Sequence, residues 1–360
     1  MPSRTLRVLI VDDSAVVRQI LSSLLAEAGD MVVTTAGDPY IALRRMEQEH
    51  PDVIVLDLEL PRMDGLTFLR RLMRDPTPVP VVVCSGHVGQ GSELALRALD
   101  EGAVEVLARP KIGVREFLQE SAVALVDAVR AAAGARMSHR LPRRPAPPPP
   151  PRGGGRLPRL IAIGASTGGP EAILRILEAL PADAPPVLLV QHMPEGFTAA
   201  FARRLDASCR IAVKEAEDGD AVLPGRALLA PGNRHLLLVR QGTGWVAGVR
   251  DGPLVCRHRP SADVLFQSVA REAGSLAAGV LLTGMGSDGA DGLLEMRRAG
   301  AATYAQNEES CVVFGMPKEA IARGAAGEVL SLADIPRALL RPSPAVPAAG
   351  SRRSGGRAGE

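Results

Sequence analysis

Short apolar runs that end in a polar residue and lead into a segment with helical spacing recur along this chain. In its first third the runs are residues 7–11, 31–34, 53–56, 79–84 and 104–107, and the segments with helical spacing include 16–25, 39–49, 91–100 and 114–130. Runs rich in valine and isoleucine are typical of buried parallel strands. Five repeats of strand then helix predict a doubly wound parallel sheet, which is an α/β fold.

The length of 360 residues suits two or three domains. Residues 131–157 are rich in proline, glycine and arginine, which predicts a flexible, partly extended linker. Strand patterns at 160–163, 187–190 and 279–282 follow it and indicate a second doubly wound sheet. We therefore expect one α/β domain over residues 4–130, a second over 158–340, and a disordered tail over 341–360, which is rich in Pro, Ala, Gly, Ser and Arg.

The composition indicates which partners this protein binds and in which cell compartment it works. A formal net charge of +2 gives no strong attraction to nucleic acid or membrane surfaces, so we expect neither partner. No apolar run reaches membrane-spanning length and the N-terminus lacks a signal-peptide pattern, so we expect no membrane insertion. The four cysteines stand apart without metal-ligand spacing, which indicates reduced thiols in a cytoplasmic protein.

Polar side chains follow the strands of the first domain where each strand ends. Asp12 and Asp13 follow the first strand, Asp57 the third, and Ser85 the fourth. The carboxyl ends of parallel strands meet in one crevice, where three carboxylates repel one another and favour a hard cation such as Mg²⁺. The alternative is that Asp12 and Asp13 cap the first helix, although a cap does not account for Asp57.

A glycine-rich turn opens the second domain. Ser166 lies between glycines in residues 164–169, after an apolar strand and before Pro170, which fits the first position of a helix. Such a strand-to-helix turn exposes a serine hydroxyl beside the N–H groups of the helix start, as a nucleophile requires. The alternatives are a turn without catalytic function or a phosphate-binding loop, and no Gly-Lys-Ser/Thr sequence follows.

A serine nucleophile needs a base and a carboxylate that orients the base. His192 follows the strand at 187–190, and Asp288 lies on a glycine-rich loop after the strand at 279–282. The chain order Ser, His, Asp differs from that of α/β-hydrolases and indicates a separate fold. His235 and His258 are alternative bases, ranked lower because neither directly ends a strong apolar strand. Asp288 could instead cap a helix, although Asp291 can serve that cap equally well.

Residues 6–130 resemble a response-regulator receiver domain, most closely in the segment Leu56–Leu66 that contains Asp57. The resemblance implies a flavodoxin-like fold and phosphorylation of Asp57. It implies Mg²⁺ held by Asp12, Asp13, Asp57 and the Glu59 carbonyl, with Ser85 contacting the phosphoryl group. Two positions depart from the family: Arg109 precedes the proline where receivers carry lysine, with Lys111 one residue beyond it, and Val106 occupies the aromatic switch position.

The second domain resembles the catalytic domain of the chemotaxis protein-glutamate methylesterase family, which is Rossmann-like. The motifs are residues 164–170, 191–194, 196–205, 230–235, 258–263, 282–286, 306–307 and 313–317. The resemblance implies Ser166 as nucleophile, His192 as general base and acid, and Asp288 as its orienting partner. Met285 and nearby backbone N–H groups would form the oxyanion site, supported by Thr167.

The resemblance also implies a function. The substrates would be glutamate methyl esters of methyl-accepting chemotaxis receptors, with methanol released and no cofactor used. The same enzyme would deamidate specific receptor glutamines. A chemotaxis histidine kinase would be the phosphodonor, and the receiver would occlude the catalytic crevice until phosphorylated. We expect a monomer. Two alternatives remain: the same enzyme in a chemosensory pathway that does not steer motility, and a receiver joined to a non-catalytic binding module.

Overall fold

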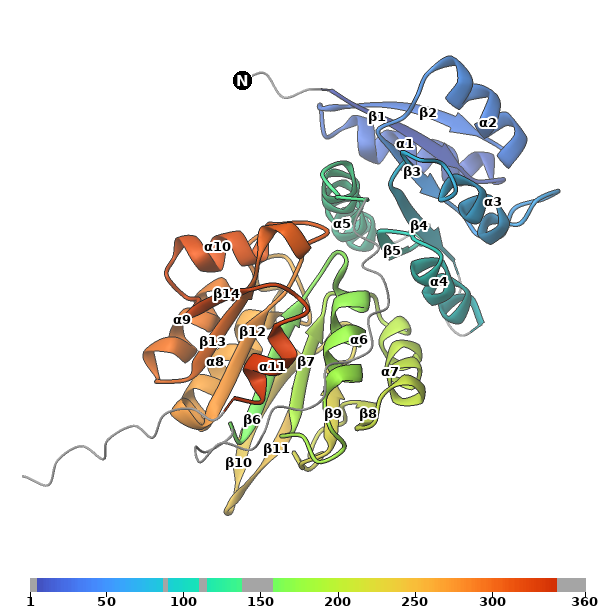
Figure 1. The fold of residues 1–360 in the computed structure, drawn as a ribbon. Helices are drawn as coiled ribbons and strands as arrows, with labels where there is room; N and C mark the ends of the chain where they lie inside the picture. Colours follow the sequence, from blue (N-terminus) through green and yellow to red (C-terminus); the bar gives the residue numbers. More distant parts are fainter. Residues whose placement is uncertain (1–4, 87–89, 110–114, 138–157, 342–360) are drawn as a thin grey trace, which may run out of the picture.

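The computed structural model describes residues 5–86, 90–109, 115–137 and 158–341, which form two α/β domains (Figure 1). Most of the predicted linker, residues 138–157, and the predicted tail from 342 onward lie outside the described residues. Among the helices that the structure describes, none combines the length and the apolar character needed to cross a membrane.

The first domain is a five-stranded parallel sheet in the order β2-β1-β3-β4-β5. Its strands are β1 (Leu6–Val11), β2 (Met31–Ala36), β3 (Val53–Leu56), β4 (Val81–Ser85) and β5 (Glu105–Ala108). Its helices are α1 (Ala15–Ala26), α2 (Pro39–Gln48), α3 (Gly65–Leu72), α4 (Gln90–Asp100) and α5 (Arg115–Ala133). This order confirms the predicted flavodoxin-like fold. Helix α5 extends to Ala133, so residues 131–133, predicted as linker, are helical.

Alternate residues of these strands pack on opposite faces of the sheet, as the pleat requires. Val82 packs with residues of α1 and α5, whereas Val81 and Val83 pack with residues of α3 and α4. Helix starts follow from local capping: the Asp38 carboxylate accepts hydrogen bonds from the N–H groups of Tyr40 and Ile41, both at 2.9 Å, just before α2.

The second domain is a seven-stranded parallel sheet in the order β14-β13-β12-β6-β7-β9-β8, which confirms the second doubly wound domain. The strands are β6 (Leu160–Ala165), β7 (Val187–Gln191), β8 (Ala212–Glu215), β9 (Arg226–Leu229), β12 (Ala277–Leu281), β13 (Ala302–Gln306) and β14 (Glu328–Leu330). The helices are α6 (Gly169–Ala179), α7 (Phe197–Ser208), α8 (Ala262–Glu272), α9 (Ala290–Arg298), α10 (Met316–Ala322) and α11 (Ile335–Leu339), with short 3₁₀ turns at Gly274–Leu276 and Glu308–Ser310. An antiparallel hairpin, β10 (His235–Gln241) and β11 (Gly244–Arg250), was not predicted.

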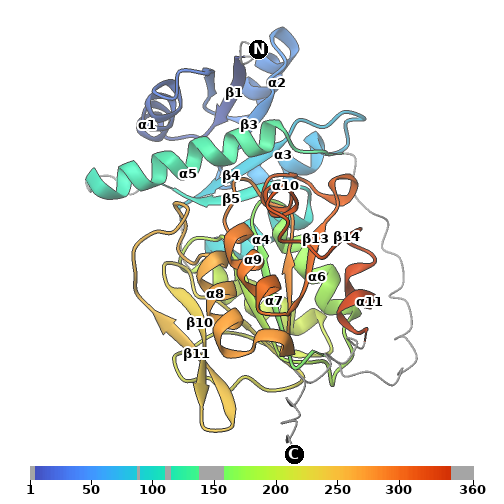
Figure 2. The same ribbon diagram turned by 90° about the vertical axis from the view of Figure 1, so that its left-hand side faces the viewer.

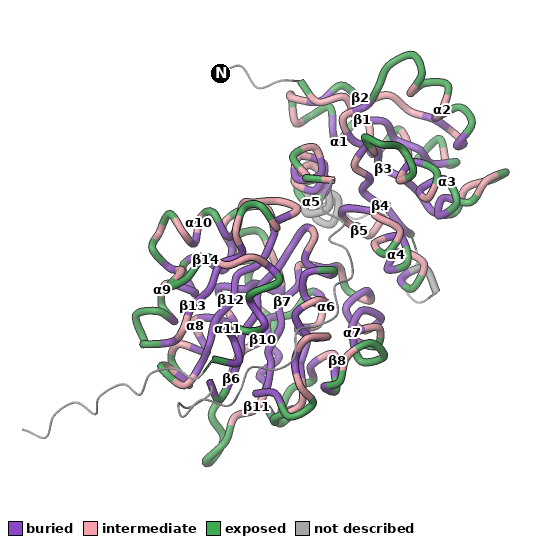
Figure 3. The backbone as a smooth tube through the Cα atoms, in the orientation of Figure 1, coloured by how far each residue is buried: buried purple, intermediate pink, exposed green. Residues whose placement is uncertain are grey.

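Both sheets are buried between helical layers, and the outer surfaces of the helices are exposed (Figure 3). The chain reverses direction across the second sheet at β6, since β7 lies on one side of it and β12 on the other. In an open α/β sheet, ligands bind outside the carboxyl ends of strands at such a switch point. The loops after β6, β7 and β12 therefore lie where a ligand is expected to bind.

The first domain packs against the second through α4, which lies on α7, and through the α5 side, as Figure 2 shows. Among the described residues, four ion pairs cross the junction: Arg204 with Asp100, Arg203 with Glu93 at 3.6 Å, Arg257 with Asp127 at 2.9 Å, and Arg136 with Glu308 at 2.6 Å. Apolar residues of both domains belong to one continuous buried cluster. The two domains are thus docked rather than merely tethered.

Candidate functional sites

Ser166 and His192 stand at neighbouring strand ends because of strand register. Ala165 on β6 pairs with Gln191 on β7, and each candidate residue comes next in the chain. Neighbouring strands are about 4.8 Å apart, so the two residues start side by side. The Gln191 side-chain amide donates to the carbonyls of Ser166 at 3.0 Å and His192 at 3.1 Å. These two hydrogen bonds hold the carboxyl ends of β6 and β7 next to each other.

The turn from β6 into α6 requires glycine at residue 168. Its φ of +76° lies in the left-handed region, and a Cβ there would press on the side chain of Val312. Helix α6 begins at Gly169, one residue earlier than the proline signal indicates. Ser166 therefore precedes the N–H groups of a helix start, and with 7 % exposure it is closed off from solvent in this structure.

Asp288 reaches His192 across the end of β6. The distance from Nε2 of His192 to Oδ2 of Asp288 is 2.8 Å, and both side chains are buried. Asp288 also accepts hydrogen bonds from the Ser261 hydroxyl and the Ala262 N–H, each at 2.6 Å. Burial alone would raise the pKa of Asp288, but the hydrogen bonds from His192 and Ser261 lower it below its usual range, so the carboxylate is ionised at neutral pH.

The contact with Asp288 selects a tautomer of His192. A carboxylate is an acceptor, so Nε2 carries the proton and Nδ1 carries the lone pair. Nδ1 is buried and receives no hydrogen bond within the described part of the chain. The imidazole therefore keeps one ring nitrogen free to accept a proton, on the strand end next to the one that carries Ser166. Proton removal from a serine hydroxyl needs a nitrogen in this state within hydrogen-bond reach.

His258, which the sequence offered as an alternative base, and Ser261, to which sequence reasoning assigned no function, both belong to this site. The rings of His258 and His192 stack with centroids 3.8 Å apart and an interplanar angle of 12°. Burial and the neighbouring His192 hold the pKa of His258 well below its usual range, so this ring is neutral. His258 thus supports the plane of the His192 ring. The sequence pointed to His258 as a lower-ranked base and to both residues through the family-like motif at 258–263, but it did not predict the stacking.

The loop after β12 brings Met285 to the same edge. Gly284 lies so close to Ser166 that a Cβ would contact the serine side chain and the sulfur of Met316. The Gly284 carbonyl accepts hydrogen bonds from the N–H groups of Gly315 at 3.0 Å and Met316 at 2.8 Å. Met285 is the next residue, so its backbone lies close to Ser166.

Thr167 contacts the first domain in this structure. Its hydroxyl is hydrogen-bonded to the carboxyl of Glu105 on β5, and its carbonyl accepts from the Thr283 hydroxyl at 2.9 Å. Glu105 is half-buried at this junction. The first domain therefore lies directly over the residue that follows Ser166, a contact that no sequence pattern indicated.

The carboxylates of the first domain lie together as expected. Oxygen atoms of Asp12, Asp13 and Asp57 are all within 4.8 Å of one another. Burial raises the pKa of Asp57 to about 6, although Arg109 opposes the rise. Three hard oxygen donors fit Mg²⁺. The capping alternative is wrong for α1, because Ser14 caps that helix by accepting from Val17 at 3.4 Å.

Arg109 occupies the position between two of these carboxylates. Its Nη2 is 3.0 Å from Oδ2 of Asp12 and 2.7 Å from Oδ2 of Asp57. Ser85 is buried at the end of β4, and Val106 is buried on β5. The Glu59 N–H donates to Asp57. Lys111, the other cation that the sequence offered here, lies outside the described residues.

Comparison with known proteins agrees with this two-domain geometry. Residues 8–120 match the response regulator receiver domain family, and residues 161–339 match the CheB methylesterase family. Two proteins of Anaeromyxobacter dehalogenans named protein-glutamate methylesterase/protein-glutamine glutaminase are 58 % and 60 % identical to this chain. The alignments cover 94 % and 93 % of this chain and 97 % and 98 % of the relatives. The crystal structure of the Thermotoga maritima CheB methylesterase catalytic domain is 40 % identical, covers 50 % of this chain and 96 % of that one, and has a TM-score of 0.49.

Proposed function

This chain belongs to the CheB methylesterase family, and on that premise we propose that it hydrolyses glutamate γ-methyl esters on methyl-accepting chemotaxis receptors and deamidates specific receptor glutamines. The single observation that carries the proposal is the buried pair of His192 and Asp288, 2.8 Å apart, beside Ser166. A non-catalytic binding module would have no use for a basic nitrogen held in one tautomer next to a serine.

In the proposed reaction, the Ser166 hydroxyl attacks the ester carbonyl while Nδ1 of His192 takes its proton. The ionised Asp288 stabilises the imidazolium that results. Backbone N–H groups around Met285, supported by Thr167, stabilise the negative charge on the carbonyl oxygen. His192 then gives its proton to the departing methoxide, and methanol leaves.

Water completes the reaction. His192 removes a proton from the water, the oxygen attacks the acyl group on Ser166, and the serine leaves with the proton returned by His192. The product is a receptor glutamate. A receptor glutamine follows the same acyl-enzyme route, with ammonia as the leaving group. This esterase and amidase chemistry uses only side chains and backbone of the second domain and no cofactor.

The proposed function is tested by incubating the full chain with a methylated receptor fragment and measuring methanol, and with a glutamine-bearing receptor fragment and measuring ammonia. Release of both products supports the proposal. An active-site serine probe gives an independent readout, because the rival binding module predicts no label on Ser166. If neither product forms and no label is found, the hydrolase assignment is wrong.

We infer that the first domain regulates the second through phosphorylation of Asp57 by a chemotaxis histidine kinase. Asp12, Asp13, Asp57 and the Glu59 carbonyl would hold Mg²⁺, which when bound offsets the charge of the phosphoryl group. Ser85 and Arg109 would contact that group. The contact of β5 with Thr167 supports occlusion as the resting state, and added charge at Asp57 shifts the equilibrium toward an open enzyme. We further expect a cytoplasmic monomer, acting in motility or in another chemosensory pathway.

Replacing Asp57 by asparagine is expected to abolish stimulation by a small-molecule phosphodonor while leaving basal methanol release unchanged. Asparagine keeps the size of the side chain but cannot form an acyl phosphate. In the wild type we expect stimulation in the range of typical coupling, about 5- to 150-fold. Methanol release with and without phosphodonor and Mg²⁺ is the measurement. Stimulation that survives in Asp57→Asn would contradict the assignment of the phosphorylation site.

The Glu105 contact predicts a pH dependence of docking. Burial raises the pKa of Glu105 to about 7 in the docked state, from an ordinary value of 4.5. Docking therefore takes up a proton: it is strongest below pH 4.5 and weakens as pH rises to about 7. Glutamine mimics the protonated form, so Glu105→Gln should dock more tightly at pH 7.5 and show basal activity about two- to fivefold below wild type.

The ratio of wild-type to variant activity isolates this effect, because the residues of the catalytic site are the same in both proteins. We expect the ratio to approach one near pH 5. Glu47→Gln is the matched control, since Glu47 is an exposed carboxylate of the first domain on α2, away from the ion pairs of the junction. A ratio that is flat between pH 5 and 7.5 would show that Glu105 does not govern docking.

A further inference from the structure

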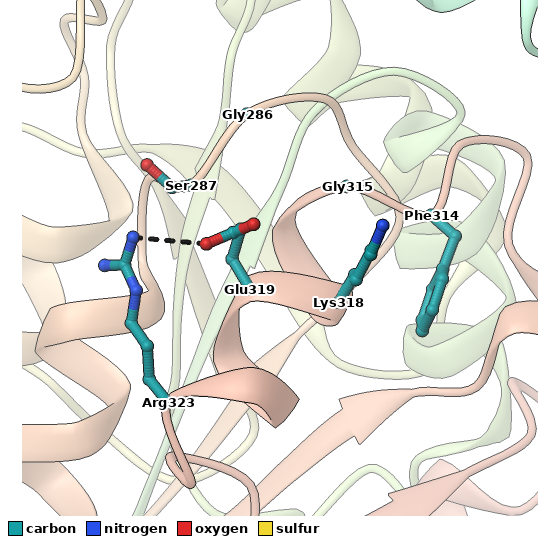
Figure 4. A pocket seen from close by; sticks show the side chains of 7 residues that line it. All are labelled: Gly286, Ser287, Phe314, Gly315, Lys318, Glu319 and Arg323. Carbon is teal, nitrogen blue, oxygen red and sulfur yellow. Dashed lines mark hydrogen bonds and ion pairs between the residues drawn. The ribbon is translucent and has the colours of Figure 1, made fainter. Parts of the chain in front are cut away.

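A pocket beside the catalytic loop has no assigned use. It has a volume of about 420 Å³ and is lined by Gly286, Ser287, Phe314, Gly315, Lys318, Glu319 and Arg323, as Figure 4 shows. One wall is the loop that leads to Asp288, and the other is the segment that begins α10. The volume lies within the usual range of ligand pockets, about 300–1,000 Å³.

The pocket is attached to the reacting centre through Gly284. This residue contacts the Ser166 side chain and hydrogen-bonds through its carbonyl to Gly315, which lines the pocket. Gly286, on the opposite wall, is only two residues away along the chain, at most about 7 Å. A substrate held at Ser166 therefore has its neighbouring surface over the pocket, within about two helical turns of 5.4 Å each.

The charges of the pocket are unevenly compensated. Arg323 forms ion pairs with Asp291 at 2.7 Å and with Glu319 at 3.3 Å, and Figure 4 marks the Glu319 pair by a dashed line. Lys318 is exposed and forms no ion pair with any residue that the structure describes. In Figure 4 its ammonium group stands between Glu319 and the ring of Phe314. The charges of these residues sum to zero with Asp291 included, and Lys318 is the cation among them that no carboxylate of the described residues contacts, next to an aromatic wall.

We propose that this pocket, the Lys318 subsite, binds a carboxylate side chain of the receptor helix one to two turns from the target glutamate ester. The inference rests on the proposed function and adds a recognition element to it. Side chains three, four and seven positions apart share one face of a helix, so a helix that presents an ester to Ser166 presents such a neighbour to Lys318. Lys318 then pairs with the carboxylate, and Phe314 packs against its methylene groups.

The test uses the full chain treated with phosphodonor and helical receptor peptides that carry one glutamate γ-methyl ester. One peptide set has glutamate at positions three, four or seven from the ester, and the matched set has glutamine there. For the glutamate peptide, Lys318→Met should lower kcat/KM about two- to fivefold, mainly through KM, and Lys318→Glu about tenfold. Both variants should hydrolyse a small ester, N-acetyl-glutamate γ-methyl ester amide, at the wild-type rate.

Charge reversal gives the decisive comparison. Lys318→Glu should recover activity on a peptide with lysine in place of the neighbouring glutamate, whereas the control Arg298→Met on α9 should alter neither peptide. Fluorescence anisotropy measures the affinity for the peptides, and so tests the Lys318 subsite independently of hydrolysis. If both lysine variants bind and hydrolyse glutamate and glutamine peptides in the wild-type ratio, the subsite is wrong. If the wild type fails on the small ester, the proposed function is wrong instead.

Discussion

Replacing Ser166 by alanine is expected to lower kcat for methanol release by about 10⁶-fold, to the level of background hydrolysis. Without the hydroxyl no acyl-enzyme forms, and His192 and Asp288 have no nucleophile to activate. Deamidation of receptor glutamines should be lost in parallel, because both reactions pass through the same intermediate. Methanol and ammonia assays on one protein preparation measure the two losses together.

The variant should otherwise remain intact. Alanine fits the site, so we expect the free energy of unfolding to stay within about 1 kcal/mol of wild type. Phosphorylation of Asp57, in the other domain, should be unaffected and serves as an internal control for folding. If Ser166→Ala retains more than a small fraction of either activity, the nucleophile lies elsewhere and the proposed mechanism fails.

Replacing Asp288 by asparagine is expected to lower kcat by about 10⁴-fold. An asparagine amide can donate to Nε2 of His192, which reverses the tautomer and places the ring proton on Nδ1. The base that faces Ser166 is then lost although the geometry is nearly unchanged. Asp288 also accepts from Ser261 and Ala262, so we expect a loss of about 1–3 kcal/mol in the free energy of unfolding.

Measuring kcat and the free energy of unfolding separately distinguishes the catalytic effect of Asp288→Asn from its effect on stability. At a temperature where the variant is fully folded, kcat should still be low, while KM for the receptor fragment should change little. Glu295→Gln is the matched control, because Glu295 is an exposed carboxylate on α9 and its loss should affect neither quantity. An Asp288→Asn enzyme with near wild-type kcat would leave His192 without the proposed partner.

Much of this site could be predicted because parallel strands place their carboxyl ends at one edge. Ser166, His192 and Asp288 each follow a strand, and the register of Ala165 with Gln191 brings the first two side by side. The same argument from strand ends predicts that Asp12, Asp13 and Asp57 lie together, as they do. Element ends were less predictable: α5 continues three residues beyond its predicted end, and the hairpin of β10 and β11 carries no strong alternation.

The contacts that were missed depend on tertiary structure rather than on local pattern. His258 stacks on His192, and Ser261 donates to Asp288, because the chain leading into α8 folds over the strand ends. Glu105 contacts Thr167 only because two domains dock. The periodicity of a single segment does not predict contacts between distant segments. The sequence therefore offered His258 only as an alternative base and as part of the family-like motif at 258–263.

The hydrogen bonds of the Gly284 carbonyl limit how the substrate specificity of this protein can be changed by exchanging segments. Its carbonyl joins the segment that leads to Asp288 to the segment that leads to Lys318 through two backbone hydrogen bonds. A graft of residues 313–323 that places any residue other than glycine at position 315 would press a Cβ on the Gly284 carbonyl and disturb the loop that leads to Asp288. Chimeras should therefore exchange residues 282–288 together with residues 313–323. Substrate specificity and catalytic rate then change together.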